Sequence, residues 1–279
     1  MRVALALVLT LVATATPAAQ ADATRPTVFA AASLSDAFPK LALAGLLGAV
    51  IIGTAAAQSV TDRATVYAAA SLTDAFPKIA PNARFSFAGS NSLAAQIRQG
   101  APADVFASAN MKIPFGLYGD NFCSRPAVFT RNALVMIVPR KNRAHIRSVF
   151  DLKRKGVKLV VADKGVPVGD YTVQVLQKLK LTGVLKNVVS RETDVREVLA
   201  KVALDEGDAG FVYATDARTV PKKVRVISIP ARGRPTIEYG ICVVLGSHNK
   251  PAAQAFVRRI LGPAGQRILR SYGFLPRRP

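Results

Sequence analysis

The sequence predicts an α/β fold of two lobes, each a sheet covered by helices, with the chain crossing twice between them. Patterns typical of strands and helices alternate along residues 63–279, which is the first observation behind this prediction. The second is composition: 50% of the 279 residues are hydrophobic and 20% are charged, so the chain can bury a sizeable core. The third is size, because a body of about 217 residues fits two α/β lobes better than one large sheet.

Five elements alternate at the start of this body. We expect strands at 65–69, 84–87 and 104–108, because each is a short apolar run rich in β-branched or aromatic residues. Helices are expected between them, at 72–79 and 93–98, where the apolar residues recur with a helical period.

The same alternation continues to the end of the chain. We expect parallel sheets, because strands that are joined through helices run in the same direction. The expected elements are, in order, a strand at 133–138, a strand at 158–162, helices at 171–179 and 195–204, strands at 209–213, 224–229 and 240–245, and a helix at 252–261.

The order of these elements suggests how the chain is divided between the lobes. We expect lobe one to contain residues 63–133 and 242–279, and lobe two to contain residues 134–241. The crossings then fall at 133–139 and 239–245, and closure of the lobes on a ligand would hinge there.

Charge and composition argue against several classes of function. Lys and Arg number 38 against 17 Asp and Glu, and the net charge of +21 lies entirely on residues 63–279. Nucleic-acid binding is nevertheless disfavoured, because the basic runs 153–155 and 222–225 are not interleaved with aromatic residues. Two histidines and two cysteines argue against a structural zinc site. No nucleophile-elbow, phosphate-loop, dinucleotide or zinc-protease motif is present, so we expect a protein that is not an enzyme. We also expect a monomer.

The first residues have the organisation of a secretory signal. A basic start precedes the apolar run 3–13, and Ala19 and Ala21 match an A-x-A cleavage site. We therefore expect residues 1–21 to be a signal peptide and the protein to be periplasmic or otherwise extracytoplasmic.

Residues 22–62 contain a partial duplicate of the segment that begins at residue 63. Residues 25–42 recur at 63–80 with fourteen of eighteen positions identical, and nothing downstream continues the repeat, which argues against a solenoid. The uncharged run 41–61 between the copies is a second signal-like segment, a membrane anchor or a folded helix. We favour the signal-like interpretation, with a mature body that begins near residues 58–63.

The two cysteines leave two interpretations open. An exported chain with an even cysteine count favours a disulfide between Cys123 and Cys242, both near the expected crossings. Alternatively, Cys242 is a buried strand thiol, as free cysteines commonly are.

Polar loops follow several of the predicted strands, where parallel α/β sheets bind ligands and helix N-termini attract anions. Such loops contain Ser71, Ser90 and Tyr213, and two more precede the helices that begin after 165–170 and 192–194. Each loop also has an ordinary structural interpretation, because Ser, Thr and Asp commonly cap helices. We interpret Asp74, Asp170, Asp194 and Asp216 as caps or dipole partners.

Five separated motifs occur in order along residues 63–279, at Thr65–Ala75, Phe87–Phe106, Glu192–Arg196, Gly210–Ala217 and Tyr272–Phe274. Together they resemble the periplasmic molybdate-binding proteins of ABC transporters. The resemblance implies the two-lobed periplasmic binding protein type II fold, with an oxyanion bound in the cleft between the lobes. It further implies ligand hydroxyls from Ser71, Ser90 and Tyr213, and backbone N–H donors from Ser71, Ser90, Val168 and Val195.

The implied function is capture of molybdate or tungstate for an ABC importer permease, without a cofactor and without a site for a free cation. Val168 departs from the alanine that the family often has, which affects ligand preference rather than fold. The alternatives are a receptor for sulfate or another oxyanion, and a membrane-anchored oxyanion-sensing binding protein. We expect the second copy of the duplicate to form the site, because it continues within a few residues into the next strand.

Overall fold

The computed structural model describes residues 63–277. The expected signal peptide, the first copy of the duplicate and the uncharged run 41–61 lie outside these residues. Within them, no helix is both long enough and apolar enough to cross a membrane.

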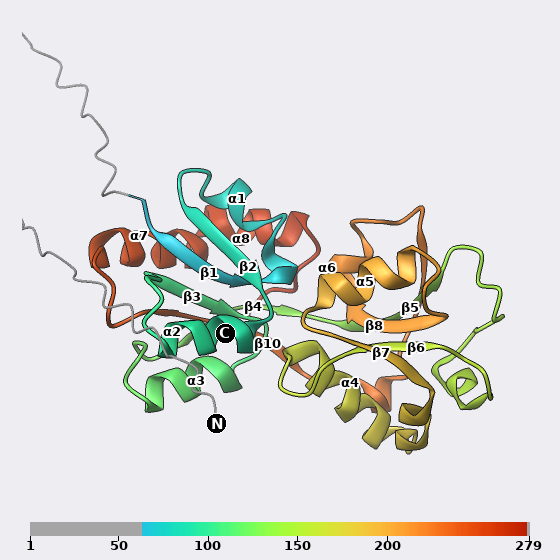
Figure 1. Cartoon of the computed structure of the whole chain (residues 1–279). Coiled ribbons are helices and arrows are strands. Elements are labelled where there is room, and N and C mark those ends of the chain that lie inside the picture. Colours follow the sequence, from blue (N-terminus) through green and yellow to red (C-terminus); the bar gives the residue numbers. More distant parts are fainter. Residues whose placement is uncertain (1–62, 278–279) are drawn as a thin grey trace, which may run out of the picture. The chain divides into compact units, whose positions relative to one another are not determined.

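Lobe one is built on a five-stranded sheet with the order β2-β1-β3-β10-β4 (Figure 1). β1 pairs in parallel with β2 and β3, whereas β10 runs antiparallel to β3 and β4. Figure 1 shows α1, α7 and α8 on one face of this sheet and α2 and α3 on the other. The strands are β1 Thr65–Ala69, β2 Arg84–Ala88, β3 Val105–Ser108, β4 Ala127–Asn132 and β10 Ile237–Val243; the helices are η2 Ala70–Leu72, α1 Phe76–Ile79, α2 Ser90–Arg98, α3 Lys112–Gly119, α7 Lys250–Leu261 and α8 Pro263–Ser271.

Lobe two is built on a second five-stranded sheet, with the order β7-β6-β8-β5-β9. β6 is parallel to β7 and β8, whereas β5 is antiparallel to β8 and β9. The strands are β5 Leu134–Pro139, β6 Leu159–Ala162, β7 Val188–Glu192, β8 Ala209–Tyr213 and β9 Val224–Ile227; the helices are η3 Val149–Lys153, α4 Pro167–Lys178, η4 Thr182–Asn187, α5 Val195–Ala203, α6 Ala214–Ala217 and η5 Ala231–Gly233.

Both sheets are therefore mixed, which corrects the expectation of parallel sheets. The antiparallel strands β5 and β10 are those that follow the crossings between lobes. A helix that packs back on its own sheet makes the next strand parallel, but a crossing from another lobe imposes no such direction.

The crossings lie at Ala133, between β4 and β5, and at residues 228–236, between β9 and β10. The boundary that we expected between residues 241 and 242 cuts through β10, which pairs within lobe one over its whole length. The apolar run 240–245 concealed the start of the strand, where buried Ile237 and Tyr239 alternate with a polar residue.

The expected helix at 72–79 is instead two short helical segments, η2 and α1. Pro77 lies in the first turn of α1, where its missing N–H costs nothing. In the middle of a longer helix the same proline would remove a hydrogen bond and clash with the preceding turn. The break places Ser71 at the end of a tight turn directly after β1.

An aromatic cluster holds this segment in place. Phe76 is fully buried, and its ring centroid lies 5.5 Å from that of Phe256 and 5.7 Å from that of Phe129. Burial of one such ring contributes roughly 1.5–3 kcal/mol. The cluster ties η2 and α1 to the sheet and to α7, so the turn that contains Ser71 rests on a packed base.

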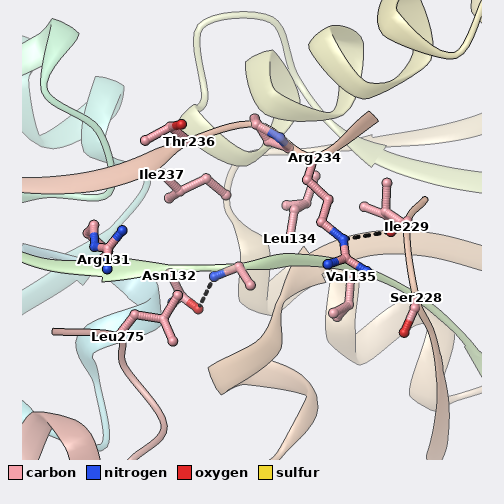
Figure 2. Close-up of a pocket in the computed structure, with 12 residues that line it drawn as sticks. Arg131, Asn132, Leu134, Val135, Ser228, Ile229, Arg234, Thr236, Ile237 and Leu275 are labelled. Atoms are coloured by element: carbon pink, nitrogen blue, oxygen red, sulfur yellow. Dashed lines mark hydrogen bonds between the residues drawn. The ribbon is translucent and has the colours of Figure 1, made fainter. Parts of the chain in front are cut away.

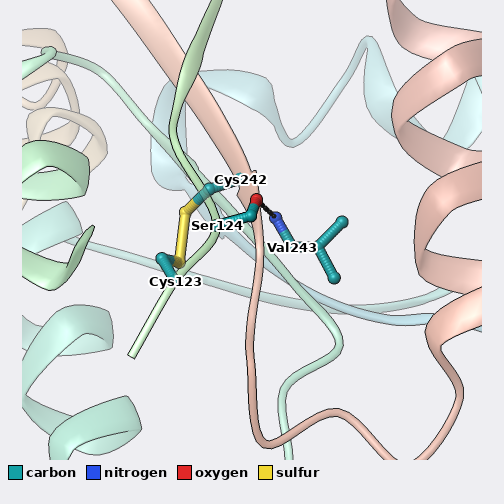
Figure 3. The surroundings of a disulfide bond; sticks show 4 residues. All are labelled: Cys123, Ser124, Cys242 and Val243. Carbon is teal, nitrogen blue, oxygen red and sulfur yellow. Dashed lines mark hydrogen bonds between the residues drawn. A yellow bond between two sulfur atoms is a disulfide. The ribbon is translucent and has the colours of Figure 1, made fainter. Parts of the chain in front are cut away.

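The structure joins Cys123 to Cys242 by a disulfide (Figure 3), with the Cα atoms 5.9 Å apart. This confirms the expected pairing, and both cysteines belong to lobe one. It ties the segment before β4 to the returning strand β10, across a loop of 119 residues. Chain-entropy arguments give such a loop about 4 to 5 kcal/mol of stabilisation.

Candidate functional site

The five sequence-predicted ligand residues meet in one pocket between the lobes. Ser71 and Ser90 come from lobe one, and Val168, Val195 and Tyr213 come from lobe two. The complete lining is Ala69, Ala70, Ser71, Ala88, Gly89, Ser90, Ala109, Val166, Pro167, Val168, Asp194, Val195 and Tyr213. The structure thus brings together residues as far apart in the chain as 71 and 213.

Both serines follow neighbouring parallel strands. Ser71 lies in η2, two residues after β1, and Ser90 begins α2, two residues after β2, so the carboxyl ends of the two strands place them at one edge of the sheet. Ser71 is 3% exposed and Ser90 1% exposed. The Oγ of Ser90 accepts a hydrogen bond from the backbone N–H of Ala109 at 3.1 Å.

Two helix N-termini of lobe two face the serines. Val168 is the second residue of α4 and Val195 is the first residue of α5, and such amides have no acceptor within their own helix. Asp194 caps α5 as expected, and its Oδ1 accepts the N–H groups of Arg196 and Glu197. The cap leaves the amide of Val195 to the pocket.

Tyr213 ends β8 at the base of the pocket. Its side chain is 1% exposed, and its hydroxyl is a buried polar group without a hydrogen-bond partner in residues 63–277. Burial raises the pKa of this phenol well above its ordinary value, so the hydroxyl keeps its proton. A protonated, unpartnered hydroxyl is a ready donor for a ligand.

The pocket suits a small species that only accepts hydrogen bonds. Its volume is about 10 Å³, far below the roughly 300–1,000 Å³ of pockets for organic ligands. No Lys or Arg lines it, and the carboxylate that does, Asp194, is engaged by its own helix. The described part of the chain contains no cluster of three metal-ligating side chains. Hydroxyls and helix N-termini without cationic side chains are an arrangement that binds an anion.

A buried polar network behind Ser71 was not predicted from the sequence. The Ser71 Oγ lies 2.9 Å from the Oη of Tyr239, and Asn132 donates from Nδ2 to that Oη at 3.2 Å. Asn132 also donates to the Oγ1 of Thr215, on α6 of lobe two, at 2.9 Å. Tyr239 reads in the sequence as an ordinary strand aromatic, so no signal distinguished it.

Arg196 connects the lobes beside the pocket. Its Nη2 forms an ion pair with Asp74 of lobe one, and its Nε binds Asp216 of lobe two at 2.7 Å. Asp74 and Asp216 were expected to be caps or dipole partners. Asp216 does lie in the first turn of α6, whereas Asp74 neither caps α1 nor lies in its first turn, and both carboxylates bind the guanidinium. Asp216 is fully buried, and this burial raises its pKa to about 6 although Arg196 opposes the shift.

The backbones of the two lobes come close together at Gly89. A Cβ atom at this position would lie 2.3 Å from the backbone oxygen of Thr193, in the loop before α5. Glycine is therefore required for the arrangement in which the N-termini of α2 and α5 face each other.

A larger cavity of about 410 Å³ lies at the crossings (Figure 2). None of the five predicted residues lines it. Its two guanidinium groups are anchored to the backbone, with Arg234 Nε donating to Ile229 O at 2.8 Å and Arg131 Nε to Pro276 O at 2.7 Å. In the smaller pocket, by contrast, buried donors converge from both lobes.

Known proteins resemble this chain in sequence and in fold. The family model for bacterial extracellular solute-binding proteins matches residues 64–275. The molybdate-binding protein ModA of Mycobacterium tuberculosis is 37% identical over 194 residues, which is 69% of this chain and 73% of that protein.

Solved structures show the same fold. The periplasmic molybdate-binding protein of Azotobacter vinelandii has a TM-score of 0.68 at 21% identity, covering 77% of this chain and 100% of that one. The sulfate-binding protein SubI of Mycobacterium tuberculosis has a TM-score of 0.67 at 18% identity, covering 78% and 88%. These likenesses confirm the expected two-lobed type II binding-protein fold.

Family model, sequence relatives and the two-lobed fold agree with one another. The chain belongs to the bacterial extracellular solute-binding proteins and, among them, to the family of the molybdate-binding proteins.

Proposed function

We propose that this protein captures molybdate, or the closely similar tungstate, outside the cytoplasm and delivers it to the permease of an ABC importer. The observation that carries the proposal is the pocket of about 10 Å³ in which uncharged hydroxyl and amide donors converge from both lobes. The proposed ligand groups are the hydroxyls of Ser71, Ser90 and Tyr213 and the amides of Ser71, Ser90, Val168 and Val195.

Donors of this kind suit a doubly charged tetrahedral oxyanion. Desolvating such an ion is costly unless each lost water hydrogen bond is replaced, and fixed amides and hydroxyls replace them at defined positions. Helix dipoles add favourable partial charge at the N-termini of α4 and α5. An ion that carries a proton needs an acceptor as well, so this donor set disfavours hydrogen phosphate.

Sulfate is the second candidate, because it too is fully deprotonated and accepts hydrogen bonds only. Cavity size then decides between a small and a large tetrahedral ion. A membrane-anchored sensor that retains its ligand is a further alternative, which depends on the fate of residues 22–62. We propose export through residues 1–21 and a monomeric mature protein.

Closure of the two lobes on the ion is the proposed binding motion. Ala133 and residues 228–236 are the segments about which the lobes would rotate. In an open state the Arg196–Asp74 ion pair would be broken, since its partners belong to different lobes. The ion pair and the ligand then both favour the closed state, and each strengthens the other.

A thermal-shift series with the mature protein tests the ligand. Molybdate and tungstate at millimolar concentration should raise the unfolding temperature, because a ligand that binds only the folded state stabilises it by RT ln(1 + [L]/Kd). Sulfate should give a smaller shift and phosphate none. Absence of a shift with molybdate would contradict the proposed function, and a larger shift with sulfate would favour the second candidate.

The two serines should each be needed for affinity. Ser71→Ala and Ser90→Ala are expected to weaken molybdate binding by roughly 1–3 kcal/mol, the range for a hydrogen bond to a charged group. Ser33→Ala, at the counterpart of Ser71 in the upstream copy, serves as the control and should leave binding unchanged. Isothermal titration calorimetry measures all three. Loss of binding in Ser33→Ala with retention in Ser71→Ala would assign the site to the other copy.

Removing the interlobe arm of the Arg196 cluster should weaken binding without unfolding the protein. We expect Asp74→Asn to lower molybdate affinity about two- to fivefold, a modest effect because the Asp74 side chain is 41% exposed. The effect should diminish as salt is added. Asp120→Asn is the matched control, since it removes an exposed ion pair with Arg98 inside lobe one. Equal calorimetric affinities for the two variants would refute a role for Asp74 in closure.

A further inference from the structure

A chain of buried hydrogen bonds runs from the first crossing to the pocket. It passes from Ala133 N–H through Asn132 and Tyr239 to Ser71, and Figure 2 shows its first bond, between Ala133 and Asn132. Exposure is 4% for Asn132, 0% for Tyr239 and 3% for Ser71. Water therefore has little access to these groups, so they must form their hydrogen bonds with one another.

The backbone fixes the direction of the chain. The amide of Ala133 can only donate, and its acceptor at 2.9 Å is Oδ1 of Asn132. The other end of the Asn132 side chain is therefore its NH₂ group, which donates to Tyr239 Oη and Thr215 Oγ1. Tyr239 Oη therefore accepts a hydrogen bond from the Asn132 NH₂ group and donates none to Asn132.

The hydroxyl proton of Tyr239 still needs a hydrogen-bond acceptor. Burial raises its pKa well above the ordinary value, so the phenol stays protonated. Its remaining neighbour at hydrogen-bond distance is Ser71 Oγ at 2.9 Å, and a buried hydroxyl proton without an acceptor costs about 1–3 kcal/mol. Tyr239 accordingly donates to Ser71. The proton of Ser71 is left free to turn toward the pocket that this residue lines.

We propose that Tyr239 and Asn132 are positioning residues that fix Ser71 as a hydrogen-bond donor and so exclude oxyanions that carry a proton. The inference rests on the proposed function, because it assumes that an oxyanion occupies the pocket. Ser90 obeys the same logic independently, since the Ala109 amide donates to its Oγ and leaves its own proton uncommitted. A P–OH or As–OH group could donate to either serine Oγ only if that serine turned its own proton away, and the contacts of the two serines offer that buried proton no other acceptor.

Tyr239→Phe is the first test, with molybdate and hydrogen phosphate titrated in parallel by calorimetry. Loss of the phenol hydroxyl frees the Ser71 hydroxyl to rotate and to accept. We expect the ratio of molybdate affinity to phosphate affinity to fall about two- to tenfold, because phosphate should bind more tightly and molybdate more weakly. Tyr67→Phe is the matched control, since Tyr67 lies on β1 outside the pocket lining, and should leave the ratio unchanged.

Asn132→Asp is the second test, because it reverses the chain. A carboxylate accepts the Tyr239 proton, Tyr239 then accepts from Ser71, and the Ser71 proton turns away from the ligand. Molybdate affinity should fall at least about tenfold. A new negative charge alone would also weaken molybdate binding, so the double variant Asn132→Asp, Tyr239→Phe separates the two explanations. Without the Tyr239 hydroxyl, the Ser71 proton is no longer held away from the ligand. Part of the lost affinity should then return.

The possible outcomes separate the two proposals. If the unmodified protein binds no molybdate, both the proposed function and the donor chain are overturned. If it binds molybdate but Tyr239→Phe leaves the affinity ratio unchanged, or the double variant binds no better than Asn132→Asp, only the donor chain is overturned. Thermal unfolding of each variant without ligand verifies that the compared proteins are folded.

Discussion

A buried hydroxyl without a hydrogen-bond partner is the constraint around which this molecule is organised. Tyr213 places such a group between two lobes, in a pocket too small for an organic ligand. An unmet buried donor costs about 1–3 kcal/mol. The first-turn amides of α4 and α5 are further donors without an acceptor in their own helices, and they belong to the same lobe as Tyr213. Ser71 and Ser90 face them from lobe one. Under the proposed function, one compact anion would accept hydrogen bonds from all of these donors at once.

The architecture supplies the donors by simple rules of sheet geometry. Ser71 and Ser90 lie at the carboxyl ends of adjacent parallel strands, and Tyr213 lies at the end of a central strand of the second sheet. Within lobe one, β10 supports the pocket. Its Tyr239 contacts Ser71, and its Cys242 is joined by the disulfide to the segment before β4. Arg196 joins the lobes through carboxylates that are not part of the lining.

Most of the pocket could be predicted from the sequence, whereas the groups behind it could not. The five proposed ligand residues follow strands or begin helices, so local pattern and family resemblance sufficed to pick residues that line one pocket. Tyr239 and Asn132 bind each other across 107 residues, and Arg196 joins Asp216 to Asp74, which lies 122 residues from Arg196. Such long-range pairing leaves no local pattern. The mixed sheets were missed for the same reason, because the direction of β5 and β10 is set by the crossings.

The central claim is that one tetrahedral oxyanion lies among donors from both lobes. Crystals of the mature protein grown with molybdate, measured on both sides of the molybdenum absorption edge, test it most directly. The account predicts a single strong anomalous peak within hydrogen-bond distance of Ser71 Oγ, Ser90 Oγ and Tyr213 Oη, with no cationic side chain in contact. A peak in the cavity at the crossings, or no peak in the enclosed pocket, would contradict it.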